Sequence, residues 1–370
     1  MSRLHRVVKD PVSGVRSFED ITPAGGLIAG GGLSFSRPSL MVPNKTSVTI
    51  PTGTTVLIGD KTYQSTDPVT LSTASLGSIA GKDVSVYAVV NTGDTLNFVL
   101  SLNGSVPDGY TADNSRKIGG FHGECVAVGT IAGHPLSGYN AGDILPASVW
   151  DLFHRPKASP EGMVYDEGLG LWVDIYLASW SGSKLQSVFG AQTADGTSTK
   201  PFHGELFAEE FGKLRKRLPM RDEFMCFAVG SNNNTNIAGS ADAGTAGGHK
   251  DTANRRMISN IGVEDCCGFL WQWTRDMFEY VPGTTAANNQ YGYYLNNYTP
   301  QTNWNYNSSV DGAANKGASW GFLRRALVGG LWANSTSCGP RCVGCDNASS
   351  YAFPSHGARG VSEPGSFLTA

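Results

Sequence analysis

A stretch near the C-terminal end, Trp320 to Val361, constrains the fold more than any other part of the chain. Glycines, a tryptophan and arginines occur at intervals along it, and the residues between them follow no helical period. Glycine pairs let backbones approach closely or take positive φ, a tryptophan supplies a large buried anchor, and an arginine ties loops together through several donors. The pattern therefore predicts short strands and turns. The intervening residues are small, polar or aromatic in no order, which suits a binding surface better than a catalytic site.

Composition bounds the rest of the chain. Its 370 residues suffice for two or three domains, and 47 glycines with only 16% charged residues favour turns and short strands over a helical enzyme. The net charge of −3 does not indicate the basic surface that attracts nucleic acid, so we expect no nucleic-acid partner. No apolar run approaches the roughly 20 residues of a membrane helix, so we expect no membrane insertion. The first residues lack the apolar core of a secretory signal, which favours a component made inside a cell.

The N-terminal part divides into two regions. Residues 1–43 are rich in Gly, Ser and Pro, so we expect an extended or loosely structured arm for attachment or oligomerisation. Residues 44–147 contain runs of β-branched and aromatic residues bounded by turn dipeptides, which predict an antiparallel β-sandwich. His122 lies in this region, and we expect a structural role for it because no second ligand is near in sequence.

Residues 148–370 are expected to form one further domain that contains both strands and helices. The alternation over residues 169–177 predicts its opening strand, and phenylalanines at helical spacing followed by Pro and acidic residues predict two short helices between 201 and 230. Trp271 and Trp273, two apart, indicate a core strand. The sequence thus predicts a mainly β protein with some α: an N-terminal arm, a β-sandwich and a C-terminal α+β domain.

The spacing of Gly329-Gly330, Trp332 and Gly357-Ala358-Arg359 resembles the variable region of proteins diversified by retroelements. This family has a C-type lectin fold and includes receptor-binding proteins of phage tail fibres; residues 107–124 and 145–180 resemble such a tail-fibre member as well. In the family, a reverse transcriptase errs at adenines, so that chosen codons vary while the fold stays fixed. The resemblance places the following residues at variable, ligand-binding positions: Leu331, Ala333, Ser335, Ser337, Gly344, Asp346, Asn347, Tyr351, Phe353, Ser355 and His356. It places a second set on the framework: Gly329, Gly330, Trp332, Arg341, Gly357 and Arg359.

The resemblance implies a receptor-binding protein whose variable C-terminal surface recognises a cell-surface molecule of a bacterial host, expected to be a protein. It further implies a homotrimer at a phage tail-fibre tip that contacts other tail-fibre proteins, is made in the host cytoplasm and needs no cofactor. A variable protein displayed on a bacterial cell surface is the alternative within the family. Tyr351 and Phe353 are the expected anchors, because large rings carry much of an interface's energy.

An insertion over residues 284–316 is dense in Asn and Tyr, a composition typical of antibody loops. Two interpretations stay open. The insertion extends the variable surface, or it is a solvated loop of low complexity.

The seven cysteines, without a secretory signal, predict mostly free thiols. The spacing of Cys338, Cys342 and Cys345 resembles the cluster-binding motif of radical enzymes, but too few residues follow it for the barrel that those enzymes use. A structural zinc site is also disfavoured, because no fourth ligand lies at a suitable spacing. We therefore expect no metal.

Formylglycine-generating enzymes use the same variant of the lectin fold and are the competing class. Their copper-binding cysteine pair would fall on Asn334 and Gly339, so it is absent here. The carboxylate clusters, Glu209-Glu210, Glu264-Asp265 and Asp276 with Glu279, are expected to be solvated faces or helix-start charges, because none has a neighbouring base or the spacing of a metal loop. The tripeptides through which many C-type lectins bind sugar and calcium do not occur. We predict no enzymatic activity and no catalytic residue.

Overall fold

The computed structural model describes residues 5–9, 16–20, 41–279, 304–305, 318–319, 323–345 and 347–365. Two strands of the N-terminal arm, β1 (His5–Lys9) and β2 (Arg16–Asp20), pair antiparallel. These residues therefore form a hairpin within the expected arm, and the role of the arm in attachment or oligomerisation stays a prediction. The β-branched residues Val7 and Val8 favour a strand, a local preference that the glycine-rich composition of the arm conceals.

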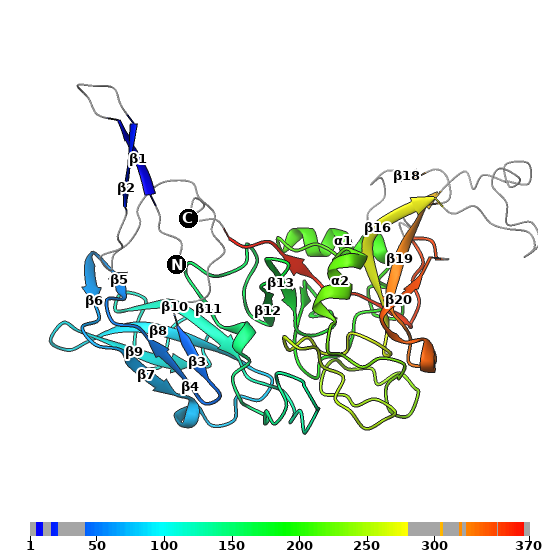
Figure 1. Ribbon diagram of the computed structural model, residues 1–370, viewed down its shortest axis with the longest axis horizontal. Coiled ribbons are helices and arrows are strands. Elements are labelled where there is room, and N and C mark those ends of the chain that lie inside the picture. Colours follow the sequence, from blue (N-terminus) through cyan, green and yellow to red (C-terminus); the bar gives the residue numbers. More distant parts are fainter. Residues whose placement is uncertain are drawn as a thin grey trace, which may run out of the picture.

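The predicted β-sandwich is confirmed: two sheets and a hairpin share one apolar core (Figure 1). Burial alternates along β4 and β5, as a strand with one face on a core requires. One sheet has the order β3-β4-β7, from β3 (Val42–Asn44), β4 (Ser47–Ile50) and β7 (Val69–Ser72), and the hairpin joins β5 (Thr55–Ile58) to β6 (Lys61–Gln64). The other sheet has the order β11-β10-β8-β9, from β8 (Asp83–Asn91), β9 (Thr95–Ser101), β10 (Ser115–His122) and β11 (Trp150–Asp151); the 3₁₀ helix η1 spans Thr73–Leu76.

The chain between β10 and β11 packs against the C-terminal part of the molecule. Four of its residues are buried in an apolar cluster otherwise formed by residues 164–361: Cys125, Val128, Leu136 and Leu145. His122, at the end of β10, is buried as well; its Nδ1 lies 2.8 Å from Asp83 Oδ1 and its Nε2 lies 2.9 Å from the Tyr176 hydroxyl. These contacts agree with a structural histidine. The domain division near residue 147 stays a proposal.

The C-terminal part contains two larger sheets, a small hairpin and both α-helices. The three-stranded sheet β12-β13-β22 is formed by β12 (Met163–Asp166), β13 (Leu171–Asp174) and β22 (Val361–Ser362), and the hairpin by β14 (Ser179–Trp180) and β15 (Leu185–Gln186). The four-stranded sheet β20-β19-β16-β21 is formed by β16 (Trp271–Glu279), β19 (Leu323–Gly329), β20 (Gly339–Gly344) and β21 (His356–Gly357). The predicted core strand is confirmed, because Trp273 in β16 is fully buried, while Trp271 is only partly buried. Short 3₁₀ helices span Pro146–Ser148 (η2) and Ser335–Ser337 (η5).

The two predicted helices are also confirmed. In α1 (Gly204–Lys213), Phe207 and Phe211 are buried in a cluster with tryptophans of β14 and β16. In α2 (Arg221–Phe227), Glu223 accepts a hydrogen bond of 2.7 Å from the backbone N–H that precedes the helix. α1 packs on β16 and α2 packs on β16, β19 and β20, so both helices brace the four-stranded sheet.

Most of the Asn- and Tyr-rich insertion lies outside the described residues, so both interpretations of it stay open. Only β17 (Trp304–Asn305) falls within it, paired with β18 (Ala318–Ser319). Within the part of the chain that the structure describes, no helix has the length and apolarity needed to cross a bilayer.

Candidate binding surface

The four-stranded sheet positions the segment that was predicted to vary. Leu331 pairs with Phe269, just before β16, and His356 pairs with Trp271, the first residue of β16. The loops that precede β20 and β21 therefore meet the same end of the sheet. In Figure 1, β19 and β20 lie at the side of the molecule remote from the β-sandwich.

Most predicted variable positions within the described residues are exposed or half-buried. The exposed ones are Ala333, Ser335, Ser337, Tyr351 and Phe353; the half-buried ones are Leu331, Gly344, Asn347 and Ser355. Tyr351 and Phe353 keep 40% and 43% of their surface exposed, and their ring centroids lie 5.6 Å apart. Exposed aromatic pairs of this kind suit an interface anchor. Asp346 lies outside the described residues, and a single continuous face formed by the whole set stays a prediction.

His356 is the exception, and its assignment to the exposed surface is wrong. Only 4% of its surface is exposed. Parallel pairing of β21 with β16 turns its ring inward, where it meets Trp273 edge-on with centroids 5.2 Å apart. Phe353 covers it from outside at the same centroid distance. His356 is therefore a packing residue beneath the surface.

Two framework glycines close the turn after β19. Gly329 and Gly330 both have φ of +88°, a region that favours glycine. A Cβ at Gly329 would lie 2.4 Å from the carbonyl oxygen of Cys266, so the close approach also requires glycine. The half-buried Trp332 then donates its backbone N–H to the carbonyl of Phe269 at 2.8 Å. These contacts hold the start of the variable loop against the strand below it.

Arg359 is the central tie of the framework. Its side chain is fully buried and donates to four acceptors. Its Nη1 lies 2.7 Å from the carbonyl oxygen of Asp174 and 2.6 Å from that of Ile175, and its Nη2 lies 2.5 Å from that of Glu264. Its Nε lies 3.1 Å from Gln272 Oε1 in β16. One guanidinium therefore joins three separate segments beneath the sheet.

Arg341 departs from the expectation for a framework arginine. It lies on β20, an edge strand of the four-stranded sheet, and its side chain is exposed. Among the described residues it has no hydrogen-bond or ion-pair partner. The burial along β20 alternates, and Val343 shares the exposed side with Arg341. The described part of the chain therefore shows no loop held by Arg341, and its framework role stays a prediction.

The cysteines are free thiols, as predicted. Cys338 is buried, Cys342 is half-buried and Cys345 is exposed; among the described residues the three do not form a group able to hold a metal. Burial, with a smaller contribution from Cys342, raises the pKa of Cys338 to about 11. The two positions that would carry copper ligands in the competing enzyme class hold Asn334 and Gly339, which make contacts within and beside the loop before β20. Asn334 Oδ1 accepts the N–H of Leu331 at 2.7 Å, and Gly339 packs against Asn233.

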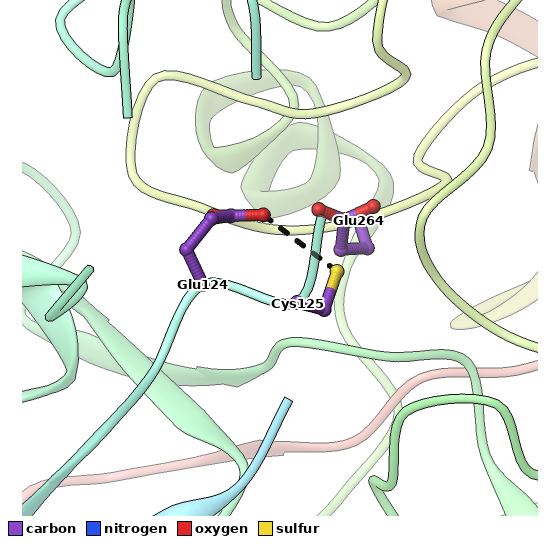
Figure 2. A group of neighbouring side chains, drawn as sticks. All are labelled: Glu124, Cys125 and Glu264. Carbon is purple, nitrogen blue, oxygen red and sulfur yellow. Dashed lines mark hydrogen bonds between the residues drawn. The ribbon is translucent and has the colours of Figure 1, made fainter. Parts of the chain in front are cut away.

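A buried polar cluster lies where the β-sandwich meets the C-terminal domain (Figure 2). Glu124 and Cys125 follow β10, and Glu264 belongs to the loop before β16. Arg256 Nη2 lies 2.5 Å from Glu264 Oε1, 3.3 Å from Glu124 Oε1 and 3.7 Å from Cys125 Sγ. The expected solvated placement of Glu264 and Asp265 is therefore wrong, because Arg256 neutralises the first within the core. His249 Nδ1 lies 2.9 Å from the buried Asp265 carboxylate and compensates its charge. No local pattern joins Glu124 to Arg256, so sequence reasoning missed the cluster.

The fold and the exposed end of the sheet define a class of scaffold: a β-sandwich joined to an α+β domain that carries loops at its far end. Residues 39–151 match the family model of the Mtd second domain. The chain is 29% identical over 335 residues to a tail fiber receptor-binding protein of Bordetella phage BPP-1, covering 85% of this chain and 79% of that protein.

Solved structures of related proteins extend the match to the fold. The Major Tropism Determinant M1 variant aligns with a TM-score of 0.68 at 26% identity, over 87% of this chain and 81% of that one. The U1 variant aligns with a TM-score of 0.70 at 24% identity, over 97% and 94%. The resemblance indicated by the sequence is confirmed, as is the mainly β fold with a C-type lectin-like C-terminal domain.

Proposed function

We propose that this chain is a receptor-binding protein of a phage tail fibre and that the C-terminal loop surface recognises a molecule on the host cell. The observation that carries the proposal is the pairing of an exposed aromatic and small-residue surface with the buried Arg359, whose guanidinium holds three segments beneath it. The similarity to a tail fiber receptor-binding protein over most of both chains supports it. The proposed binding residues are Leu331, Ala333, Ser335, Ser337, Gly344, Asp346, Asn347, Tyr351, Phe353 and Ser355.

The mechanism is non-covalent recognition by a rigid scaffold. Arg359, Gly329 and Gly330 hold the ends of the loops, so side chains between them can change at little cost to stability. This division of labour is what diversification by a retroelement requires, and we propose that the surface is diversified in that way. A homotrimer on a virion would turn weak single-site contacts into firm adhesion. The proposed organisation is an arm over 1–43, a β-sandwich over 44–147 and a lectin-like domain over 148–370.

We further propose that the surface works without catalysis, cofactor or metal. Support comes from the structural use of Asn334 and Gly339, which leaves no cysteine pair at the copper-binding positions of the competing enzymes. The comparisons agree, because the named relatives are receptor-binding proteins and tropism determinants.

Truncation of the aromatic pair tests the surface. Tyr351→Ala with Phe353→Ala should weaken attachment of the full chain to host bacteria by about tenfold or more, since buried aromatic anchors usually cost more than 1 kcal/mol each when removed. The melting temperature should change by no more than about 2 °C. Binding would be measured by titrating labelled protein on cells that the source phage infects.

The matched control is Leu57→Ala with Leu102→Ala, which removes two comparably exposed apolar side chains from the β-sandwich. That variant should bind as the wild type does. Equal loss of binding in both double variants, or unfolding of the aromatic variant, would contradict the proposed surface.

Deep sequencing of codons 284–361 across a source population tests diversification. Substitutions should accumulate at the proposed binding residues, spare Gly329, Trp332 and Arg359, and match adenines in a nearby template repeat. An invariant segment without such a repeat would reject retroelement diversification and leave a fixed binder. Neighbouring export genes in place of tail genes would favour the cell-surface alternative.

A further inference from the structure

Two series of buried contacts cross from the β-sandwich and the chain after β10 to the C-terminal domain. In one, Asp83 contacts His122, which contacts the Tyr176 hydroxyl. In the other, Glu124 contacts Arg256, and Arg256 contacts Glu264. The carbonyl of Glu264 in turn accepts from Arg359, the central tie of the binding framework. The cluster therefore links the base of the candidate surface to the β-sandwich.

Within the described residues, the Glu124 and Glu264 carboxylates are in direct contact with one cation, Arg256, so they carry an excess negative charge when both are ionised. Glu124 approaches Arg256 from one loop, and Glu264 approaches Arg256 from another. Cys125 and Tyr176 are neutral neighbours of Glu124. Asp265 lies beyond Glu264 and is paired with His249. Burial lowers the pKa of His249, but the Asp265 and Glu264 carboxylates together raise it above its usual value. Asp143 turns its carboxylate away, toward the N–H of Asn140 and Lys45. Arg256 is thus one cation between two buried carboxylates.

A metal ion does not suit this place. Glu124, Cys125 and Glu264 offer ligand atoms within 4.8 Å of one another, but Arg256 Nη2 already lies within hydrogen-bonding reach of all three. A second cation there would meet the guanidinium at close range in a medium of low dielectric. A proton bound to one of the two carboxylates removes the excess negative charge without a second cation. Glu124 Oε2 is buried and has no hydrogen-bond partner among the residues that the structure describes, and a neutral carboxyl tolerates this far better than a carboxylate does.

We propose that Glu124 and Glu264 share one proton beside Arg256, and that this proton latches the chain between β10 and β11 onto the C-terminal domain. When the proton is present, one carboxylate faces one guanidinium and the junction is neutral. When it leaves, a second buried negative charge appears without a partner, and the junction loosens. The latch makes the connection between the binding domain and the β-sandwich dependent on pH.

The direction of the effect follows from the pKa of Glu124. Burial first, and repulsion from Glu264 second, raise that pKa from 4.5 to about 7. Because the folded-state value lies above the unfolded one, the contribution to stability is complete below about pH 4.5. It is lost as the pH rises to and through about 7. Wild-type protein should therefore be less stable at pH 8 than at pH 5.5.

Glu124→Gln tests the latch in the full chain, because glutamine imitates the neutral carboxyl. We expect melting temperatures equal to wild type at pH 5.5, and higher than wild type by about 2 °C or more at pH 8. Hydrogen exchange of residues 124–145, corrected for intrinsic rates, should speed up above pH 7 in wild type and not in the variant. The raised pKa of His249 acts in the same direction in both proteins, so the difference between their profiles isolates the shared proton.

Glu167→Gln is the matched control, because Glu167 is exposed. It should keep the wild-type pH profile. Parallel profiles for wild type and Glu124→Gln would overturn the proposal. If Glu124→Gln does not fold, infrared spectra of wild type between pH 6 and 8 decide: loss of a protonated carboxyl band supports the latch, and an unchanged spectrum overturns it. Receptor is absent from every arm, so failure here leaves the proposed binding function untouched.

Discussion

Arg359 and Arg341 stand close together in the chain, yet their surroundings differ completely. Arg359 is fully buried and donates to the backbones of two segments and to Gln272. Arg341 is exposed on an edge strand and, in the described part of the chain, has no partner. The comparison separates two environments that look alike in sequence: one arginine joins buried segments, and the other is exposed at the edge of the sheet.

The same division separates the glycine turn from the aromatic pair. Gly329 is locked against the carbonyl of Cys266, whereas Tyr351 and Phe353 project into solvent over the buried His356. Stability should therefore concentrate in Arg359 and the glycines, and binding should concentrate in the exposed rings. A surface can tolerate repeated substitution only when the two sets of residues overlap little.

The largest expected effect comes from Arg359→Ala. It leaves three buried carbonyl oxygens and the Gln272 amide oxygen without this donor, and each unsatisfied group costs about 1–3 kcal/mol. We expect the free energy of unfolding to fall by about 4 kcal/mol or more, or the chain not to fold. Guanidinium denaturation of the full chain measures this change.

Arg359→Lys sharpens the same comparison. Lysine keeps the charge but has no planar fork, so one ammonium cannot reach acceptors on both sides as the guanidinium does. Its loss of stability should lie between wild type and alanine. A lysine variant as stable as wild type would show that charge alone, without the fork of hydrogen bonds, organises the framework.

A smaller loss is expected from Gly329→Ala. The new Cβ would lie 2.4 Å from the Cys266 carbonyl oxygen and would carry a φ of +88°, so we expect a loss of about 2–3 kcal/mol. Gly93→Ala is the control, because Gly93 has φ of +94° with nothing within 4 Å of the added atom. It should cost only about 1 kcal/mol, the backbone contribution alone. Equal losses at both sites, measured by denaturation, would show that the close approach at Gly329 is not tight.

The sequence predicted those features whose signals are local. The alternation of β4 and β5, the phenylalanine spacing of α1 and the tryptophans of β16 are short-range patterns, and all are confirmed. The features that the sequence did not indicate depend on pairing between distant segments. His356 is buried because β21 pairs in parallel with β16, and Arg341 is exposed because β20 lies at the sheet edge.

The polar cluster shows the same limit more strongly. Glu124 follows β10, whereas Arg256 and Glu264 belong to the long segment between α2 and β16, so Glu124 meets the other two only in the folded chain. In sequence, Glu264-Asp265 looks like an ordinary solvated acidic pair. Such a pair can be buried only beside a compensating cation, and the residues next to Glu264 in sequence do not indicate that Arg256 is that cation.

The smallest effect, and the sharpest contrast with Arg359, is expected from Arg341→Ala. An exposed side chain without a partner contributes little to folding, so the free energy of unfolding should change by no more than about 0.5 kcal/mol. The same denaturation experiment as for Arg359→Ala measures it. A loss above about 1 kcal/mol would show that Arg341 acts as a framework residue, as the family resemblance implied. Because no partner for it lies in the described part of the chain, such a loss would have to come from residues outside that part or from a second copy of the chain.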